Sequence, residues 1–475
     1  MDLEKKYTSD LNSHDKKNES ILKSKQILEK YKVNIGDNVK ITSNKDNFYG
    51  IIMPRYESFN DNHIVIKLKS GYNMGILIEH ILSITKDENT HPSNDGSQIL
   101  IGYKDSTLSQ SKEDEVIRDS IESKSLPKIL LISTGGTIAS KIDYRTGGVT
   151  SLLTASEIYS IFPEISKFAL IFPEYLFNEY SENITPQHWS KLSERITHAI
   201  LHENYNGIII SHGTDTMHYT SSAISFALQN LPIPVVFVGS QRSSDRPSSD
   251  AFTNLMGAIK FISATKLSGV FVCMHHTSSD NIIACHLGTR LRKNHTSKRN
   301  AFQSLDSIPF ALIDNSNIIF NVPINKITPR NNNIKNFISK TSFDDRVFLL
   351  KFYTGFDPSF LDCFLNLNFK IIILEGTGLG HINKNCFHYI KKLISSGIII
   401  FMTSQCIYGR VQMTVYDTGR DLLDLGVIPL SDMSSETAVV KAMWALGNSL
   451  SRDNFIELMR SNISNEVSNT SLLVP

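Results

Sequence analysis

The first residues that could do chemistry lie in the stretch KILLISTGGTIAS, at residues 128–140. An apolar, strand-like run there stops at Thr-Gly-Gly-Thr. Glycine pairs permit backbone conformations and close approaches that other residues resist, and they leave amide N–H groups free to face a ligand. The hydroxyls of Thr134 and Thr137 are therefore either turn or helix caps, or nucleophiles that wait for a base to remove their proton.

A second polar turn closes another apolar run, IIISHGTDTMHYT at residues 208–220. Thr214 and Asp215 lie where this predicted strand gives way to a helix. Taken alone, they are an N-cap and a first-turn acid stabilised by the helix dipole, or catalytic groups. Lys293, in the basic segment GTRLRKNHTSKRNAF, by itself indicates a solvated loop or a phosphate contact. Tyr144, in SKIDYRTGGV, is by itself a loop tyrosine.

Alternating strands and helices must position these turns. After residue 127, apolar runs of strand length recur, namely KILLIS, GIIIS, VVFVGS, GVFVCMHH, VFLLKFY, KIIILEG and GIIIFMTS. Continuous apolar runs suit parallel strands covered on both faces, and the helical stretches between them indicate right-handed βαβ units in doubly wound sheets. Such sheets bind ligands at the carboxyl ends of their strands, which is where both threonine turns lie.

The chain is predicted to contain several parts of different character. Its length of 475 residues suggests roughly two or three domains at about 150 residues each. Short runs separated by Gly, Asn and Asp turns near the N-terminus indicate a small all-β barrel. We therefore expect a polar tail at 1–34, the barrel at 35–86, a linker at 87–127, and two α/β domains at 128–330 and 345–475.

Composition argues against several classes of protein. Hydrophobic residues make up 41% and charged residues 20% of the chain, as in a soluble globular protein, and a formal net charge of +1 gives no global basic field for nucleic acid. The five scattered cysteines form no CxxC pair and no metal-ligand spacing, so we expect reduced thiols and no metal site. The N-terminus lacks an apolar signal core and no run reaches the roughly 18 apolar residues of a membrane helix, so the expected location is the cytoplasm.

TGGT, GTDT and the downstream TRLRK together resemble the type I/II L-asparaginase family, over residues 127–475. The resemblance implies an asparaginase-like fold of two domains with doubly wound parallel sheets, and two threonine-centred triads. It implies that Thr137 is the primary nucleophile on a side-chain amide, with Tyr144 as its partner from a mobile loop. Thr214, Asp215 and Lys293 resemble the second triad.

The second triad has a consistent physical logic. Asp215 would hold the ammonium of Lys293 near the Thr214 hydroxyl, and a desolvated lysine in that position can accept a proton. Two threonines would then flank one amide carbon. Whether covalent attack falls to the first threonine or is shared with the second stays open.

The resemblance also implies substrate-binding groups. Backbone N–H groups near Gly136 and Gly213 would stabilise the oxyanion, a contribution of about 3 kcal/mol per donor in comparable sites. The family holds the α-amino and α-carboxylate groups of the substrate with a serine and an acid or amide, which match Ser181 and Glu182 in FNEYSENITPQ. Without that context, the same two residues would be a surface turn.

The N-terminal barrel and the segments SENITPQHW, GTRLRKNHTSKRNAFQS, EGTGLGH and SSETAVVKAMWALG resemble the D-subunit family of archaeal glutamyl-tRNA(Gln) amidotransferases. This resemblance implies a glutaminase that hydrolyses L-glutamine and supplies ammonia to a partner, the amidotransferase E subunit. The partner would use ATP and Mg²⁺ to convert Glu-tRNA(Gln) to Gln-tRNA(Gln), in a heterotetramer of two D and two E subunits. No cofactor is expected in this chain, which has no GxxxxGK[ST] motif, and the asparaginase-like part is expected to form a homodimer.

Two other hypotheses compete with this one. A stand-alone cytosolic L-asparaginase with an added N-terminal domain would use almost the same chemistry, so Thr137 does not separate the two. A non-catalytic scaffold with a retired site predicts the loss of one essential group. The sequence retains all of those considered, namely Thr137, Thr214, Asp215 and Lys293.

Overall fold

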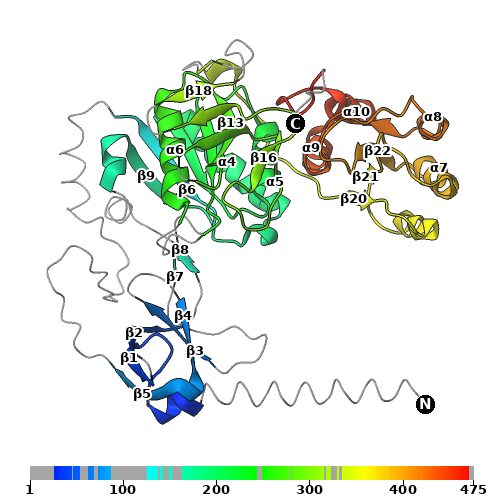
Figure 1. Ribbon diagram of the computed structural model, residues 1–475. Coiled ribbons are helices and arrows are strands. Elements are labelled where there is room, and N and C mark those ends of the chain that lie inside the picture. The colour runs from blue at the N-terminus through cyan, green and yellow to red at the C-terminus, as the bar shows by residue number, and fades with distance from the viewer. Residues whose placement is uncertain are drawn as a thin grey trace, which may run out of the picture. The chain divides into compact units, whose positions relative to one another are not determined.

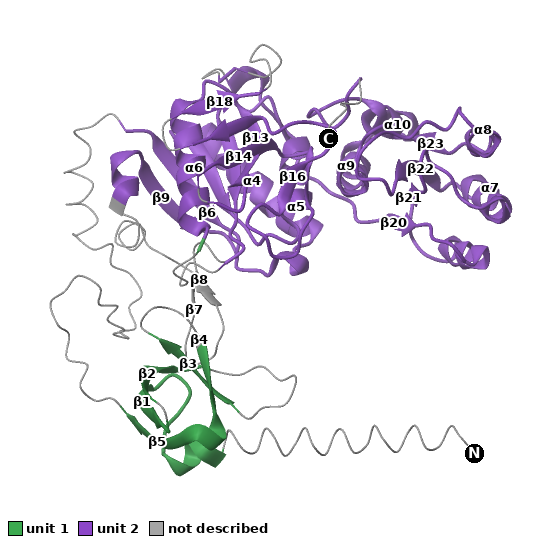
Figure 2. Ribbon diagram, in the orientation of Figure 1, with its two compact units in different colours: residues 1–112, 140–150, 244–249 green, residues 113–139, 151–243, 250–475 purple. Residues whose placement is uncertain are grey.

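The computed structural model describes residues 26–44, 46–53, 63–68, 73–86, 126–136, 140–142, 149–151, 163–242, 249–279, 281–314, 317–321, 329–330 and 334–469. Most of the linker predicted at 87–127 lies outside these residues. The described chain divides into two compact units, which Figure 2 distinguishes by colour. The first unit comprises residues 1–112, 140–150 and 244–249, and the second comprises residues 113–139, 151–243 and 250–475.

The first unit is a five-stranded antiparallel sheet with the strand order β4-β3-β2-β1-β5. Its elements are β1 (Asn38–Ser43), β2 (Asn47–Ile52), β3 (His63–Leu68), β4 (Asn73–Leu77), the 3₁₀ turn η1 (Ile78–His80) and β5 (Ile81–Lys86). Alternate strand residues such as Ile64 and Ile66 point into one buried core. Ile27 and Leu28, in a helical turn at residues 26–30, pack against this core, so the packed unit begins before its first strand. The predicted small antiparallel domain is confirmed.

The second unit begins with an eight-stranded sheet, which with its helices is called the first lobe. The strand order is β18-β17-β14-β13-β12-β10-β6-β9. The parallel strands are β6 (Lys128–Ser133), β9 (Leu170–Tyr175), β10 (Gly207–Ser211), β12 (Pro234–Val238) and β13 (Gly269–His275), and the antiparallel strands are β14 (Ile283–Leu287), β17 (Ala311–Ile313) and β18 (Ile318–Phe320). The predicted α/β architecture is confirmed. The antiparallel extension is a difference from the predicted parallel sheet, and it arises because these last strands follow one another without crossover helices.

Helices cover both faces of this sheet, which explains the continuous apolar runs. Helices α4 (Pro186–His202) and α5 (Met217–Ala227) lie on one face, and α6 (Ala251–Ala264) lies on the other (Figure 1). Along β6, Leu130 and Ile132 join the core with α4 and α5, whereas Ile129 and Leu131 join the core with α6. Each apolar residue of the strand is therefore buried on one side or the other.

A four-stranded parallel sheet with its helices forms the second lobe, in the order β20-β21-β22-β23. Its elements are β20 (Val347–Lys351), η6 (Pro358–Leu365), β21 (Ile371–Gly376), η7 (Lys384–Cys386), α7 (Phe387–Ser395), β22 (Ile399–Ser404), α8 (Asp417–Asp424), β23 (Ile428–Pro429), α9 (Ser435–Asn448) and α10 (Arg452–Arg460). Helix α9 packs against α5 of the first lobe, where the rings of Phe226 and Trp444 stack with their centroids 5.9 Å apart. One core cluster consequently runs through both lobes.

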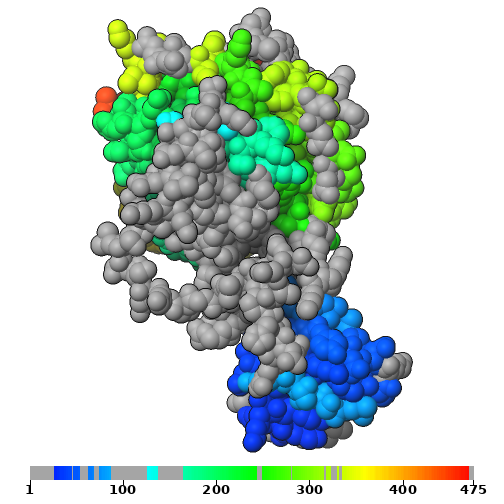
Figure 3. Space-filling model, turned by 90° about the vertical axis from the view of Figure 1, so that its left-hand side faces the viewer, coloured from blue at the N-terminus to red at the C-terminus, as the bar shows by residue number. Residues whose placement is uncertain are grey.

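Short elements connect the main ones. They are β7 (Ser140–Ile142), β8 (Val149–Ser151), η2 (Pro163–Lys167), η3 (Ser181–Asn183), β11 (Leu228–Gln229), β15 (Leu291–Lys293), β16 (Phe302–Ser304), η5 (Ile334–Asn336) and β19 (Ile338–Ser339). Strand β9 is an edge strand, and the teal atoms of its region reach the surface in Figure 3. Within the described ranges, no helix is both long and apolar enough to cross a membrane.

Replacing Trp444 tests whether α9 holds the two lobes in one core. Trp444 is fully buried, and its indole N–H donates to the carbonyl of Lys340 at 3.0 Å. Trp444→Ala should therefore lower the free energy of unfolding by about 3–5 kcal/mol, measured by denaturant titration. Leu450→Ala, at a side chain that is 97% exposed, is the control. Equal stability of the two variants would contradict the shared core.

Candidate active site

The candidate site lies at the carboxyl ends of β6 and β10, two neighbouring parallel strands. Their register runs up to Ser133 opposite Ser211. Immediately beyond, the backbone N–H and the hydroxyl of Thr134 both donate to the carbonyl of Ser211, at 3.1 and 2.9 Å. Thr134 is completely buried. Its hydroxyl therefore ties the two strand ends together and acts as a structural cap.

Two glycines let three segments meet beyond this tie. Gly135 and Gly136 have φ angles of +120° and +83°, which favour glycine. A Cβ atom on Gly136 would lie 2.7 Å from the backbone nitrogen of Gly213, and one on Gly135 would lie 2.2 Å from the carbonyl oxygen of Glu179. The TGGT and GTDT turns are thus in direct backbone contact, as the shared site requires.

The first predicted triad falls outside the described residues. The described residues exclude 137–139 and 143–148, so neither Thr137 nor Tyr144 is among them. Their roles as primary nucleophile and partner stay predictions. The preceding residues bring the chain to the correct edge of the sheet, next to the turn that carries Thr214.

The second predicted triad is assembled. The Nζ atom of Lys293 lies 2.8 Å from the hydroxyl oxygen of Thr214 and 2.8 Å from a carboxylate oxygen of Asp215. The lysine side chain is 8% exposed, whereas that of Asp215 is 68% exposed. The amine thus lies at the boundary between the core and solvent, where a neutral amine could accept the proton of the Thr214 hydroxyl. The structure brings these three side chains together, and their chemical roles stay predictions.

Neighbouring elements hold the threonine turn from several sides. Thr214 and Asp215 connect the end of β10 to the start of α5, and a Cβ atom on Gly239, at the end of β12, would lie 2.9 Å from the Thr214 methyl group. Lys293 is the last residue of β15, where it pairs with the buried Phe302 of β16. Both partners of the contact therefore project from ordered segments.

A chain of hydrogen bonds fixes the backbone before Thr214. The imidazole Nδ1 of His212 lies 2.6 Å from the carbonyl of Gly213, so this nitrogen carries the proton. Nε2 then accepts from the hydroxyl of Thr220 at 2.9 Å, and that hydroxyl accepts from the indole N–H of Trp189 at 3.1 Å. Burial lowers the pKa of His212 to about 4, despite the Gly213 contact. The neutral imidazole thus links the core to the turn.

The predicted substrate-binding residues lie beside the same turn. Ser181 is buried, and a Cβ atom on Gly213 would lie 2.8 Å from the Ser181 Cβ atom and 3.0 Å from its hydroxyl oxygen. The hydroxyl of Thr216 donates to the Ser181 carbonyl at 2.5 Å. Glu182 follows in η3 and is exposed. The structure therefore brings Ser181 to the site and leaves the carboxylate of Glu182 facing solvent.

Three charged or titratable groups near Lys293 were assigned no role from the sequence. Arg292 precedes Lys293 and forms an ion pair with Glu436 of α9, at 3.0 Å between Nε and Oε1. His218, in the first turn of α5, is buried, and burial together with the charge of Arg292 lowers its pKa to about 3. Of these three, only Arg292 lies in a segment, TRLRK, that the sequence analysis linked to the site. The other two depend on packing between distant elements.

Metal ligation has no candidate in the part of the chain that the structure describes. No group of three or more His, Cys, Asp or Glu side chains there is arranged to hold an ion. The expected absence of a metal site stays a prediction for the chain as a whole, because this finding concerns only those residues.

Comparison with family models divides the chain into three matches. Residues 128–325 match the model described as asparaginase, N-terminal, and residues 346–459 match the glutaminase/asparaginase C-terminal domain. Residues 33–86 match the GatD N-terminal domain.

Comparison with individual proteins extends over nearly the whole chain. The D subunit of the glutamyl-tRNA(Gln) amidotransferase from Sulfolobus acidocaldarius is 40% identical over 445 residues, with 94% of each chain covered. The protein of the same name from Pyrococcus abyssi is 39% identical, with 93% of this chain and 97% of the relative covered. Among solved structures, the thermostable L-asparaginase from Thermococcus kodakarensis is 32% identical with a TM-score of 0.64. The match covers 72% of this chain and 100% of the asparaginase chain.

Acid should destabilise the protein in part through His212. Its pKa is about 4 when folded against an ordinary value of 6.5, so between these values the unfolded chain binds a proton that the folded chain does not. The free energy of unfolding should therefore fall as the pH is lowered through this window. His212→Gln removes the titration and should reduce the slope by up to about 1.4 kcal/mol per pH unit.

Urea titrations between about pH 4.5 and 6.5 measure that slope. Thr220→Val removes the hydroxyl that bonds His212 but keeps the imidazole, so it should lower stability and retain the pH dependence. An unchanged slope in His212→Gln would show that this imidazole is not held neutral.

Proposed function

This chain belongs to the family of archaeal glutamyl-tRNA(Gln) amidotransferase D subunits, and from that membership we propose the reaction that its site carries out. It is the glutaminase of a tRNA-dependent amidotransferase, and it releases ammonia from the side-chain amide of L-glutamine. The relatives of that name cover 94% of the chain, whereas the solved L-asparaginase covers 72%. The match of residues 33–86 to the GatD N-terminal domain further favours this function over a stand-alone asparaginase.

One observation carries the proposed chemistry, namely the Lys293 amine placed 2.8 Å from both the Thr214 hydroxyl and the Asp215 carboxylate. A lysine so close to a hydroxyl can exchange a proton with it, and that exchange activates either the threonine or a water molecule beside it. Asp215 orients the amine. These three residues therefore match the second of the two triads expected in a threonine-dependent amide hydrolase.

In the proposed reaction, the hydroxyl oxygen of Thr137 attacks the carboxamide carbon of glutamine, with Tyr144 as its partner. The proton of that hydroxyl goes to the leaving nitrogen, the C–N bond breaks and ammonia departs. The product is an ester between Thr137 and the side-chain carboxyl of glutamate. Water, activated through Thr214 and Lys293, hydrolyses this ester and restores the hydroxyl.

Binding groups surround the reacting carbon in this proposal. The backbone N–H groups near Gly136 and Gly213 stabilise the oxyanion, which is supported by the direct contact between the two turns. Ser181, next to Gly213, and the exposed Glu182 hold the α-carboxylate and α-ammonium groups of glutamine. An acidic side chain suits the ammonium group.

The ammonia serves a second protein in this proposal. The partner is the amidotransferase E subunit, which uses ATP and Mg²⁺ to activate glutamate on tRNA(Gln) and converts Glu-tRNA(Gln) to Gln-tRNA(Gln). Two D and two E subunits form the complex, with the D subunits paired through their asparaginase-like parts. The reaction takes place in the cytoplasm, and this chain itself carries no cofactor.

Lys293→Ala should lower ammonia release from glutamine by about 10²- to 10⁴-fold, the usual contribution of a general acid or base. The assay is steady-state glutaminase activity of the complex, with folding checked by the melting temperature. Lys298→Ala is the matched control, because Lys298 is an exposed lysine of the same segment. If Lys293→Ala kept the wild-type rate, the second triad would be wrong.

Glutamine hydrolysis should also depend on the partner. Free ammonia is wasted without an acceptor, so addition of the partner and glutamylated tRNA(Gln) should raise kcat/KM by about tenfold or more, within the range of known allosteric couplings. The measurement compares ammonia release by the isolated chain and by the co-expressed complex, with asparagine assayed in parallel. Fast, partner-independent turnover of asparagine would support the stand-alone asparaginase instead.

A further inference from the structure

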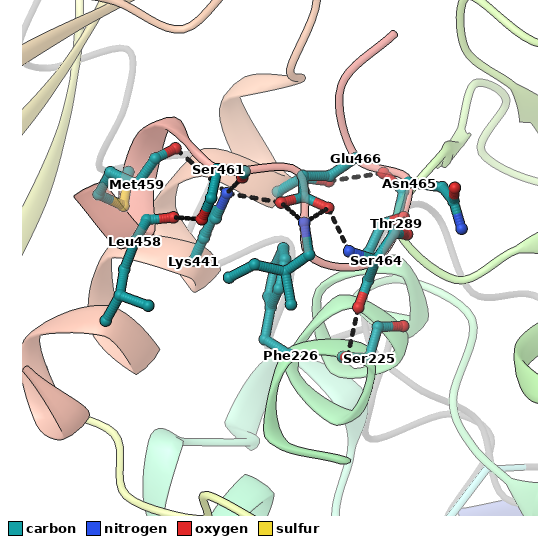
Figure 4. Close-up of polar contacts among 12 residues, drawn as sticks. Ser225, Phe226, Thr289, Lys441, Leu458, Met459, Ser461, Ser464, Asn465 and Glu466 are labelled. Atoms are coloured by element: carbon teal, nitrogen blue, oxygen red, sulfur yellow. Dashed lines mark hydrogen bonds and ion pairs between the residues drawn. The ribbon is translucent and has the colours of Figure 1, made fainter. Parts of the chain in front are cut away.

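Residues 461–469, called the C-terminal strap, follow α10 and cross from the second lobe to the first. A buried ion pair fastens this strap: Nζ of Lys441, on α9, lies 2.5 Å from Oε1 of Glu466, and both side chains are 0% exposed (Figure 4). Burial lowers the pKa of Lys441, although Glu466 opposes the shift. A buried pair of this kind persists only when its remaining donors and acceptors are satisfied.

Hydrogen bonds with the end of α10 and with the strap satisfy both members of the pair. The Lys441 ammonium also donates to the carbonyls of Met459 and Ser461, at the end of α10. The Glu466 carboxylate accepts from the backbone N–H groups of Ile463 and Ser464, at distances from 2.6 to 3.1 Å. The first half of the strap is therefore wound around Glu466, and its conformation depends on that side chain.

The wound strap then makes three direct contacts with the first lobe. The Ser464 hydroxyl donates to the carbonyl of Ser225 on α5 at 2.6 Å. In return, the Thr289 hydroxyl donates to the Ser464 carbonyl at 2.8 Å, and Nε of Arg290 donates to the Asn465 carbonyl at 3.0 Å. Figure 4 shows Ser464 lying between Ser225 and Thr289.

Further along, a second buried ion pair anchors the strap. Nη2 of Arg290 lies 2.9 Å from Oδ2 of Asp432, with side chains that are 5% and 0% exposed. Asp432 also accepts from the backbone N–H of Ser468 at 3.1 Å. The turn at residues 288–290 is thus bonded to the strap through Thr289 and Arg290, and to the second lobe as well.

The two bonded segments are those that carry the second triad. Thr289 and Arg290 directly precede β15, whose last residue is Lys293. Ser225 belongs to α5, the helix that begins just after Thr214 and Asp215. The strap therefore bridges the segments that supply the amine and its two partners, although none of its residues belongs to the triad.

We propose that Glu466 and the C-terminal strap are a positioning device for the second triad, which sets the distance between the Lys293 amine and the Thr214 hydroxyl. The proposal rests on the proposed function, because it assumes that this contact is used in catalysis. Its basis is the run of bonds from Lys441 through Glu466 and Ser464 to Thr289.

Two variants test the proposal in the full complex. Glu466→Gln removes the charge that fastens the strap, but it leaves the Lys441 ammonium buried and is also expected to destabilise the fold. Thr289→Val is therefore decisive, because it removes only the hydroxyl that donates to Ser464 and keeps the side-chain shape. It should lower kcat for glutamine by about 10- to 100-fold, as small misplacements of catalytic groups do, with KM within about twofold.

Two controls separate positioning from loss of structure. Thr289→Ser restores the hydroxyl and should restore kcat. Ser461→Ala lies on the same strap, but its hydroxyl donates to the Leu458 carbonyl of the preceding helix rather than to the first lobe, so this variant should keep kcat. All variants are compared by melting temperature. If Thr289→Val kept the wild-type kcat, or if Thr289→Ser and Ser461→Ala lost as much as Thr289→Val, the proposal would be overturned.

A readout that needs no activity separates this proposal from the proposed function. Acetic anhydride acetylates amines, and mass spectrometry gives the rate at Lys293 relative to Lys298. Thr289→Val should change that ratio, and Thr289→Ser should keep the wild-type value. An unchanged ratio in Thr289→Val would sink the positioning role. Failure of the proposed function has a different sign, namely full glutaminase activity in Lys293→Ala.

Discussion

The site depends on one ammonium group held between segments that are far apart in the sequence. Lys293 is separated by 79 residues from Thr214 and by 78 from Asp215, yet its Nζ atom contacts both. Placing a charge in the core is costly unless it is paired. Here the stem is buried while the paired carboxylate stays in water, so the amine faces the hydroxyl without a full desolvation cost for both charges.

Close backbone approach makes this contact possible. The three turns that meet around Thr214 each contain a glycine where a Cβ atom would collide with a neighbour, at Gly136, Gly213 and Gly239. Hydrogen bonds then fix what the glycines leave free, such as the Thr134 hydroxyl on the Ser211 carbonyl and the imidazole of His212 on Gly213. The backbone freedom that glycine allows is thus restricted to one arrangement, because these buried polar groups are hydrogen-bonded.

Sequence reasoning succeeded where residue type constrains the backbone or the chemistry. The TGGT and GTDT turns stand at the ends of buried strands, and the recurring apolar runs predicted a sheet covered on both faces, which the split of β6 between two cores confirms. Strands β14, β17 and β18 were missed because they are short, with five, three and three residues. Their antiparallel direction was not predictable either, because apolar content does not distinguish antiparallel from parallel strands.

Ion pairs between residues far apart in the sequence could not be predicted either. Lys441 lies among apolar residues in AVVKAMWALG, with no acidic residue beside it, and Glu466 lies in a polar segment near the C-terminus. Their contact exists only once α9, α10 and the strap have packed. Arg292 and Glu436 are likewise brought together by the packing of β15 near the start of α9. No local pattern marks such partners.

The second lobe supplies none of the predicted catalytic residues, yet it touches the strand that carries Lys293 at several points. Glu436 pairs with Arg292, the hydroxyl of Thr437 donates to the Thr289 carbonyl at 3.1 Å, and Asp432 pairs with Arg290. Each contact fixes a residue within four positions of the amine. Because buried polar contacts of this kind are costly to leave half made, the second lobe cannot shift without disturbing the turn before β15. The geometry of the candidate site is therefore a property of both lobes together.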